Sequence, residues 1–491
     1  MFGLFKKSAG AEIIFTGGNI YTQDPDAPFA EAVACKDGLI MAVGSADLIE
    51  QFQTKNTKVV DLEGGFLLPG FIDAGGHPVL RAFQEVCLIL NDDMSLEDVT
   101  LALTEYIANN PEKQSYFAYG FHFGLISSLE REEAQKLLDE IRADKPIAVL
   151  DSSGFQGWFN SEAVREVKKA AEEDARKEDE EDAAPPALTL TYILNVLSPI
   201  DFDKLREAIV FLAAEYCARG YTTVFDCGSP DYFQSVYQEI LVEALQEDLL
   251  KQRFLGSLLV TRSLDVNFVV GRLMQKKTNC MEIDNFINFN TLKLVIDTTD
   301  APEKSISPDA LKTLARAASE RGFDVHIDAA GREGLAAAFA AAAFSRAAGY
   351  NHNRFTIAHA DGLTREETED APDDDPALFE TDSTIGAYSR PLRDIKAESV
   401  QEAIDRLTIE AAEQLGVSNR YGSVAVNKKA DFAVFKEYPL SSDLAGFHVL
   451  SAAMTVVDGK IVYDADEDRP EDWLKRIASR ELDAVDPEED A

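Results

Sequence analysis

The sequence predicts an α/β fold: a TIM-type (β/α)8 barrel with a small composite β-sandwich domain formed by both chain ends. Two observations carry this prediction. The chain ends consist of short strand-like runs separated by turn residues, whereas the long middle alternates apolar runs with helical segments. The second pattern is typical of strand–helix repeats around a parallel sheet.

Turn signals define the β-rich ends. Asp37-Gly38 and Asp458-Gly459 each interrupt alternating apolar residues, which predicts two tight hairpins. We expect residues 1–67 and 417–465 to form the sandwich, with Ala11–Asp61 packed against Tyr421–Asp464.

The middle, residues 68–416, is expected to form the barrel. Helical candidates such as PDALKTLARAASERG lie between its apolar runs, and His326 and His359 are separated by a plausible length for one repeat. We expect an inserted subdomain at 78–145, an acidic insertion at 164–186 that is a solvated helix or disordered loop, and an acidic tail at 466–491. Eight runs are assigned to barrel strands: FIDAGG, PIAVLDSS, TTVFDCG, FLGSLLV, LKLVID, DVHIDA, FTIAHA and LFETDS.

The net charge limits the classes of binding partner, and the cysteine spacing indicates the state of the cysteines. With 47 basic and 87 acidic residues the formal net charge is −40, which disfavours nucleic acid and anionic membranes and leaves a small-molecule substrate. The five cysteines have no Cys-x-x-Cys spacing, so we expect reduced core residues. Neither a signal peptide nor a membrane helix is expected, which indicates a cytoplasmic protein; a homodimer is left open.

Three of the six histidines, His77, His326 and His359, fall at or just beyond the end of a predicted strand. Lys293 lies within the fifth predicted strand and Asp382 within the eighth. Strand ends meet at the mouth of such a barrel, where imidazole and carboxylate groups suit zinc and related ions. Each residue alone also has a structural explanation: a core histidine, a lysine reaching the barrel end, or an aspartate that caps a helix.

Several motifs resemble the amidohydrolase superfamily, in its amidohydrolase-3 (YtcJ-like) branch. GGFLLPGFIDAGGHPVL is similar to that superfamily's first-strand motif, Pro-Gly-x-x-Asp-x-His-x-His. FTGGNIYTQDPDAPFAEAVACKDGLIMAVGS and YGSVAVNKKADFAVF resemble its split β-sandwich. LKLVIDTT, DVHIDAAG, RFTIAHADGLT and FETDS resemble the branch's later metal motifs.

The resemblance implies a role for each candidate residue. His77 would be the second histidine of the first-strand pair, and Lys293 a carbamylated ligand that bridges two metals. His326 and His359 would bind the second metal. Asp382 would contact the metal and act as the catalytic base that activates water.

The sequence departs from the family pattern at four places. Gly75 stands where the first histidine is expected, so the first metal site lacks a ligand. Phe155 replaces a common histidine, Thr384 replaces a proline, and the usual Gly-Asp is missing after His326.

Two functions remain open. The first is a metal-dependent hydrolase of non-peptide carbon–nitrogen bonds, with about one divalent ion, zinc by expectation, held by Lys293, His326 and His359. The alternative is a catalytically inactive relative that serves as a binding or partner subunit. An isomerase or carbohydrate enzyme on the same barrel is a third reading, since fold does not fix function.

Overall fold

The computed structural model describes two compact parts of the chain. The first unit comprises Met1–Pro78, Val210–Ser229 and Glu239–Ala491, and the second comprises Val79–Ile209 and Pro230–Gln238. Within these units the structure describes residues 10–91, 94–151, 156–177, 190–283, 285–297, 305–358, 378–381, 397–441 and 443–467.

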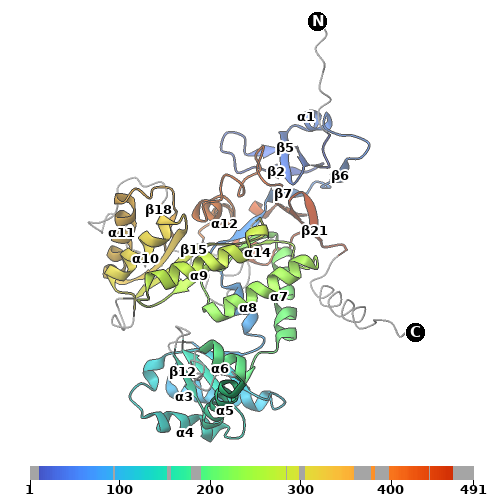
Figure 1. The fold of residues 1–491 in the computed structure, drawn as a ribbon. Helices are drawn as coiled ribbons and strands as arrows, with labels where there is room; N and C mark the ends of the chain where they lie inside the picture. Colours follow the sequence, from blue (N-terminus) through green and yellow to red (C-terminus); the bar gives the residue numbers. More distant parts are fainter. Residues whose placement is uncertain are drawn as a thin grey trace. The chain divides into compact units, whose positions relative to one another are not determined.

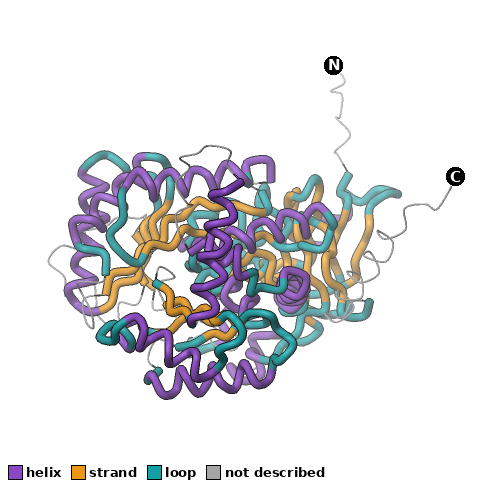
Figure 2. The backbone as a smooth tube through the Cα atoms, turned by 60° about the horizontal axis from the view of Figure 1, so that its bottom comes forward, coloured by secondary structure: helices purple, strands orange, loops and turns teal. Residues whose placement is uncertain are grey.

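A parallel sheet of seven strands forms the centre of the first unit, in the order β18-β17-β16-β15-β14-β13-β8 (Figures 1 and 2). The strands are β8 (Phe71–Asp73), β13 (Tyr221–Phe225), β14 (Arg253–Val260), β15 (Ile287–Asp297), β16 (Asp324–Ala330), β17 (Phe355–Ala358) and β18 (Leu378–Thr381). Among the described residues β8 and β18 are edge strands, so closure into an eight-stranded barrel stays a prediction.

Helices connect the strands: α7 (Phe202–Cys217), α8 (Asp231–Gln246), α9 (Val266–Asn279), α10 (Pro308–Glu320), α11 (Gly331–Ala347), α12 (Val400–Leu407) and α13 (Ile409–Gln414). Ser307 caps α10 by accepting the Ala310 N–H, and Pro308 takes the first helical position, which lacks an intrahelical N–H partner anyway. The helices predicted after LKLVID and DVHIDA are confirmed as α10 and α11.

One face of this sheet is covered by α9, α10 and α11. The apolar residues of β15 and β16 that enter the shared core are Leu292, Leu294, Ile296, Val325, Ile327 and Ala329. Because successive side chains of a strand point to opposite faces, Lys293, His326 and Asp328 lie on the other face. The alternation of side chains along β15 and β16 thus places the core residues and the candidate site residues on opposite faces of the sheet.

The second unit contains a run that we predicted to be a barrel strand. Ile147–Asp151 forms β11, which pairs in parallel with β10 (Tyr116–Phe121) and antiparallel with β12 (Gly157–Phe159). With β9 (Leu88–Ile89) these strands make a separate four-stranded sheet, so the barrel assignment of this run was wrong. All five residues of β11 are buried, and a buried run does not reveal which sheet it joins.

This second unit is larger than the insertion predicted at 78–145, because it continues to Ile209. Its helices are α2 (Pro78–Phe83), α3 (Leu96–Asn109), α4 (Arg131–Ile141), α5 (Ser161–Lys177) and α6 (Leu190–Leu197). Helix α5 includes the first part of the acidic insertion predicted at 164–186, and residues 178–189 lie outside the described residues. No helix of the described part of the chain is long and apolar enough to cross a membrane.

Strands from both chain ends share one sheet in the first unit, in the order β21-β20-β19-β7-β2-β3. A second sheet has the order β5-β4-β1-β6, and an apolar cluster joins residues of both chain ends. The strands are β1 (Ile13–Thr16), β2 (Asn19–Tyr21), β3 (Phe29–Ala30), β4 (Ala32–Lys36), β5 (Leu39–Gly44), β6 (Lys58–Asp61), β7 (Phe66–Pro69), β19 (Phe432–Phe435), β20 (Met454–Val457) and β21 (Lys460–Asp464).

Both predicted hairpins are confirmed. Asp37-Gly38 joins antiparallel β4 and β5, and Asp458-Gly459 joins antiparallel β20 and β21. All four turn residues have positive φ, 52° and 75° in the first turn and 49° and 72° in the second. Positive φ at both central residues is what the tight hairpin turn requires, and it explains the Asp-Gly pairs.

A buried arginine ties β14 to the strands from the chain's C-terminal part. Arg253 is 1% exposed and forms ion pairs with Asp431 and, at 2.5 Å, with Asp458 in the second hairpin turn. Its guanidinium carbon lies 4.7 Å from the ring centroid of Tyr421 and 5.5 Å from that of Phe286. Arginine suits this place, since its planar group can both stack and pair with two carboxylates.

Candidate active site

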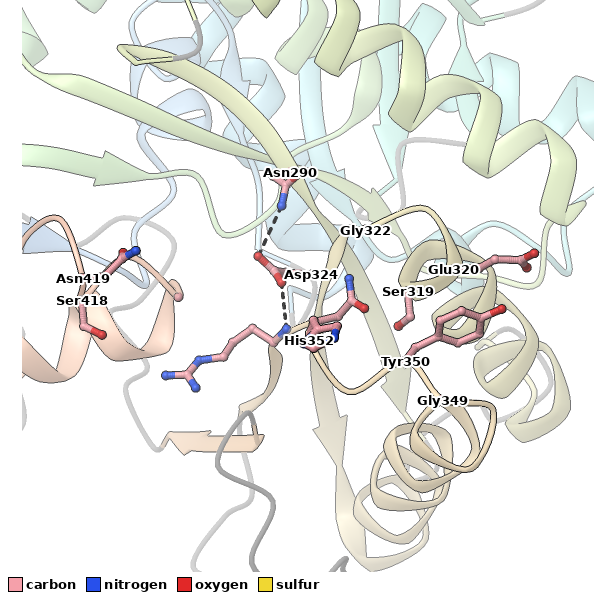
Figure 3. A pocket seen from close by; sticks show the side chains of 13 residues that line it. Asn290, Ser319, Glu320, Gly322, Asp324, Gly349, Tyr350, His352, Ser418 and Asn419 are labelled. Atoms are coloured by element: carbon pink, nitrogen blue, oxygen red, sulfur yellow. Dashed lines mark hydrogen bonds between the residues drawn. The ribbon is translucent and has the colours of Figure 1, made fainter.

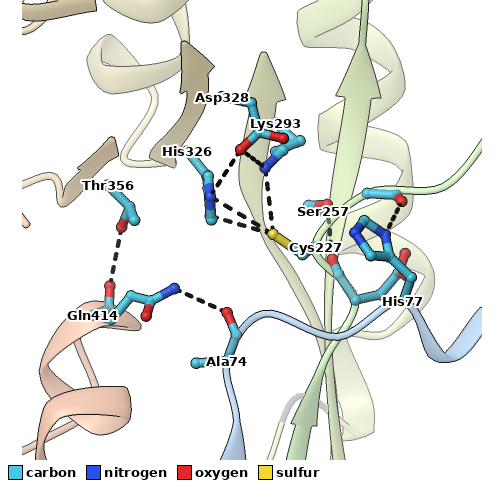
Figure 4. Close-up of polar contacts among 11 residues, drawn as sticks. Ala74, His77, Cys227, Ser257, Lys293, His326, Asp328, Thr356 and Gln414 are labelled. Atoms are coloured by element: carbon cyan, nitrogen blue, oxygen red, sulfur yellow. Dashed lines mark hydrogen bonds and ion pairs between the residues drawn. The ribbon is translucent and has the colours of Figure 1, made fainter. Parts of the chain in front are cut away.

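Two of the predicted site residues lie side by side. Lys293 on β15 is the register partner of His326 on β16, and the two side chains are 1% and 3% exposed. Figure 4 shows both pointing toward a common centre. His326 is the third residue of β16, which runs to Ala330, so its predicted position at a strand end was wrong. The strand continues because Ile327 and Ala329 still enter the core.

Asp328 holds the amine of Lys293. Lys293 Nζ lies 2.5 Å from Asp328 Oδ1 and also donates to Cys227 Sγ at 3.3 Å. Burial is the largest single influence and acts to lower the pKa of Lys293, but the charge and hydrogen bond of Asp328 together with those of Cys227 exceed it, and the pKa is raised above its ordinary value. Lys293 is therefore an ammonium ion in this arrangement, and the Asp328 pair competes with its expected carbamylation.

Cys227 completes this cluster. Its Sγ lies 3.6 Å from His326 Nε2, and the ring of Phe225 stacks on His326 with centroids 6.1 Å apart. Burial raises the pKa of Cys227 to about 12, even though Lys293 acts to lower it, so this thiol is neutral at physiological pH. His326 Nε2 also lies 3.6 Å from Asp328 Oδ1.

Sequence reasoning missed both Cys227 and Asp328. For Asp328 a signal was present, since a residue two positions after His326 in a strand shares its face. Cys227 follows β13, and only the order of strands in the sheet shows that it meets β15 and β16. All five cysteines of the chain are buried and none forms a disulfide, which confirms the prediction of reduced core residues.

His77 follows the first strand of the sheet. Its Nδ1 lies 2.7 Å from the backbone oxygen of Gly228, and the ring is half-buried. A carbonyl only accepts hydrogen bonds, so Nδ1 carries a proton in this contact. Metal-binding histidines are commonly oriented in this way by a backbone carbonyl.

The motif before His77 is organised around the buried carboxylate of Asp73. The hydroxyl of Tyr216 donates to Asp73 at 2.7 Å and the Gly75 N–H donates at 3.2 Å. A Cβ on Gly76 would lie 2.3 Å from Asp73 Oδ2, so glycine is required for this close approach. Gly75 itself offers only backbone atoms where a histidine is expected.

The remaining candidates, His359 and Asp382, lie outside the described residues, as do Phe155 and Thr384. The strands that precede His359 and Asp382 in the sequence are described. Ala358, the last residue of β17, is the register partner of Thr381, the last residue of β18. The two candidates therefore follow paired strand ends, which keeps them in the proposal below.

The fold implies a metal, and the described residues fit it in part. Imidazole and carboxylate are zinc donors, and His326 and Asp328 supply these groups beside Lys293, whereas the neutral thiol of Cys227 would first have to lose its proton. Yet no three His, Cys, Asp or Glu side chains of the described residues are grouped so as to hold an ion. Gly75 supplies no side chain where the family motif has a histidine, so one ligand of a two-metal centre is missing.

The Lys293–Asp328 pair gives a testable expectation. Replacing Asp328 with asparagine removes the charge that stabilises the buried ammonium, so the neutral amine, which can form a carbamate, becomes more populated. With 13C-labelled bicarbonate we expect a carbamate signal in the NMR spectrum of Asp328→Asn that exceeds that of the wild type, and none after Lys293→Gln. A wild-type protein that already shows one carbamate per chain would contradict this account.

The sequence model described as "Amidohydrolase family" matches residues 58–373 and 381–463. The chain therefore belongs to the amidohydrolase family, which confirms the resemblance seen in its motifs.

Three curated proteins are similar to parts of the chain. The chain is 32% identical over 167 residues to the exoenzymes regulatory protein AepA of Pectobacterium carotovorum, over 33% of this chain and 36% of that protein. It is 26% identical to LONG AFTER FAR-RED 3 of Arabidopsis thaliana, over 65% and 59% of the respective chains. It is 26% identical to the N-substituted formamide deformylase of Arthrobacter pascens, over 44% and 42%. The alignments thus span between about a third and three fifths of these relatives.

Solved structures share the fold. An uncharacterized metal-dependent hydrolase from Pyrococcus horikoshii aligns with a TM-score of 0.53 at 15% identity, over 88% of this chain and 99% of that one. A zinc-bound adenosine deaminase from Xanthomonas campestris aligns with a TM-score of 0.53 at 14% identity, over 97% and 99%. The zinc complex of the atrazine chlorohydrolase TrzN from Arthrobacter aurescens gives 0.51 at 14%, over 95% and 99%.

Proposed function

We propose that this chain is a hydrolase of carbon–nitrogen bonds in small non-peptide molecules, such as amides and N-acyl groups. The pairing of Lys293 with His326, on the face of the sheet opposite α9, α10 and α11, carries the proposal, because the motif resemblance assigns both residues to the family's metal motifs. The relative named as a deformylase supports the choice of an amide-type substrate.

One divalent ion, with zinc as the first candidate, is the proposed cofactor. His326 and His359 would hold it, with His77 and Asp382 nearby and Lys293 joining as a carbamate only after release from Asp328. The bound ion would lower the pKa of water and polarise a carbonyl group. Asp382 would accept the proton from that water and deliver it to the departing amine.

The competing proposal is an inactive binding or partner subunit. The missing side chain at Gly75 and the ion-paired state of Lys293 favour it. This alternative expects neither turnover nor a tightly held ion.

Release of free amine from a panel of N-substituted formamides, N-acyl amino acids and cyclic amides separates the two proposals. We expect turnover of at least one class by the zinc-reconstituted protein and loss of that turnover in His326→Ala, purified in parallel to control for contaminants. Absence of turnover across the panel, or equal activity in His326→Ala, would favour the inactive subunit.

A further inference from the structure

A cavity of about 680 Å³ lies at the edge of the parallel sheet where β15 and β16 begin (Figure 3). Asn290 of β15, Asp324 at the start of β16 and Arg354 just before β17 contribute from the strands. The end of α10, the loop before β17 and the loop after α13 supply the other walls. Its volume is within the range of small-molecule sites.

This cavity is distinct from the candidate active site. Asp324 is the first residue of β16 and Asp328 the fifth, so the two carboxylates are about 13 Å apart along the strand at 3.3 Å per residue. No residue that lines the cavity contributes to the cluster around Lys293.

The lining is polar and carries charges of both signs. Carboxylates come from Glu320 and Asp324, and a guanidinium comes from Arg354. The remaining lining residues are serine, asparagine, tyrosine, histidine and glycine. The carboxylates disfavour a phosphate, and the guanidinium disfavours a polyamine.

The charged groups are held in place. One carboxylate oxygen of Asp324 accepts the backbone N–H of Arg354 at 2.8 Å, and the other accepts from Asn290 at 3.4 Å. Arg354 Nε donates to the backbone oxygen of Glu413 at 2.6 Å. These bonds fix the donors and acceptors of the wall before any ligand arrives, which lowers the entropic cost of binding.

An unsatisfied hydroxyl is the second observation. Ser319, in the last turn of α10, lines the cavity and is 3% exposed, and its Oγ has no hydrogen-bond partner. A buried hydroxyl without a partner is unfavourable, and a small rotation toward a polar ligand would satisfy it. Figure 3 shows Ser319 beside Tyr350, whose ring offers a flat face to C–H groups.

We propose that this cavity binds a neutral polyhydroxylated small molecule, a monosaccharide or cyclic polyol, through Ser319, Asn290, Asp324 and the Tyr350 ring. Hydroxyl groups can both donate to the carboxylates and accept from the serine, amide and guanidinium groups. The proposal is independent of the hydrolytic activity proposed above.

Saturation-transfer NMR on the full chain tests this with D-glucose, D-ribose, N-acetyl-D-glucosamine and myo-inositol, with inorganic phosphate and spermidine as charged probes. We expect at least one of the four neutral probes to bind. Ser319→Ala should weaken its affinity by about 5-fold, the value of one hydrogen bond, whereas Ser128→Ala, at an exposed serine elsewhere, should not.

His326→Ala, which removes a proposed metal ligand, serves to distinguish the candidate active site, since binding in the cavity should survive it unchanged. The proposal is overturned if no neutral probe binds in the millimolar range, if phosphate or spermidine binds in preference, or if Ser319→Ala and Tyr350→Ala both leave the affinity unaltered.

Discussion

Asp382→Asn is expected to lower turnover by about two to four orders of magnitude, the usual contribution of a general base at a metal-activated water. Asparagine keeps the shape of the side chain but removes its basic carboxylate. Because His326 and His359 remain, the bound ion should be retained. Steady-state kinetics on the best substrate of the amide panel, together with metal content, measures both effects.

Asp203→Asn is a matched control, because this exposed aspartate lies in the first turn of α7 and belongs to the second unit, whereas the cluster around Lys293 belongs to the first. It should leave turnover unchanged. Activity that survives Asp382→Asn undiminished would remove the proposed role of Asp382.

Arg253→Ala should cost about 3–5 kcal/mol of folding stability, which is typical when one partner of a buried ion pair is removed. The reason is the isolation of Asp431, which is 6% exposed and whose carboxylate would keep, among the described residues, only the backbone N–H of Asp458 as a partner at 2.9 Å. Burial raises the pKa of Asp431 although Arg253 acts to lower it, so the loss of Arg253 would disfavour its charged form further. Urea unfolding followed by circular dichroism provides the measurement.

Arg165→Ala is the control for removing an arginine from an ion pair. Arg165 pairs with Glu162 on α5, and its side chain is largely exposed, so we expect no measurable change in folding stability. An effect of Arg253→Ala no larger than that of Arg165→Ala would show that the buried network does not stabilise the first unit.

The sequence predicted those elements whose signals are local. The Asp-Gly turns require positive φ, and α10 and α11 have helical patterns bounded by capping and glycine residues. The assignment of Ile147–Asp151 to a barrel strand was wrong. An apolar run indicates that a strand is buried, but hydrogen bonds with β10 and β12 determine which sheet it joins. The sequence of one strand alone does not show which distant strand it pairs with.

In the candidate site, too, local signals were predicted and contacts between distant strands were not. Motif spacing selected Lys293 and His326, and the register of β15 and β16 brings them together. The ion pair between Lys293 and Asp328 was not foreseen. His326 and Asp328 share one face of β16, and the sequence does not show which of them contacts the amine of Lys293. The contact between Lys293 and Cys227 depends on the order β15-β14-β13 in the sheet, because Cys227 follows β13 and Lys293 lies on β15.

Metal content of the reconstituted, active protein tests the central claim most directly. After removal of loosely bound zinc, elemental analysis should give about one ion per chain, and His326→Ala should reduce this value. Two ions per chain would contradict the loss of the first site at Gly75. None after reconstitution would contradict a metal-dependent hydrolase and favour the inactive subunit.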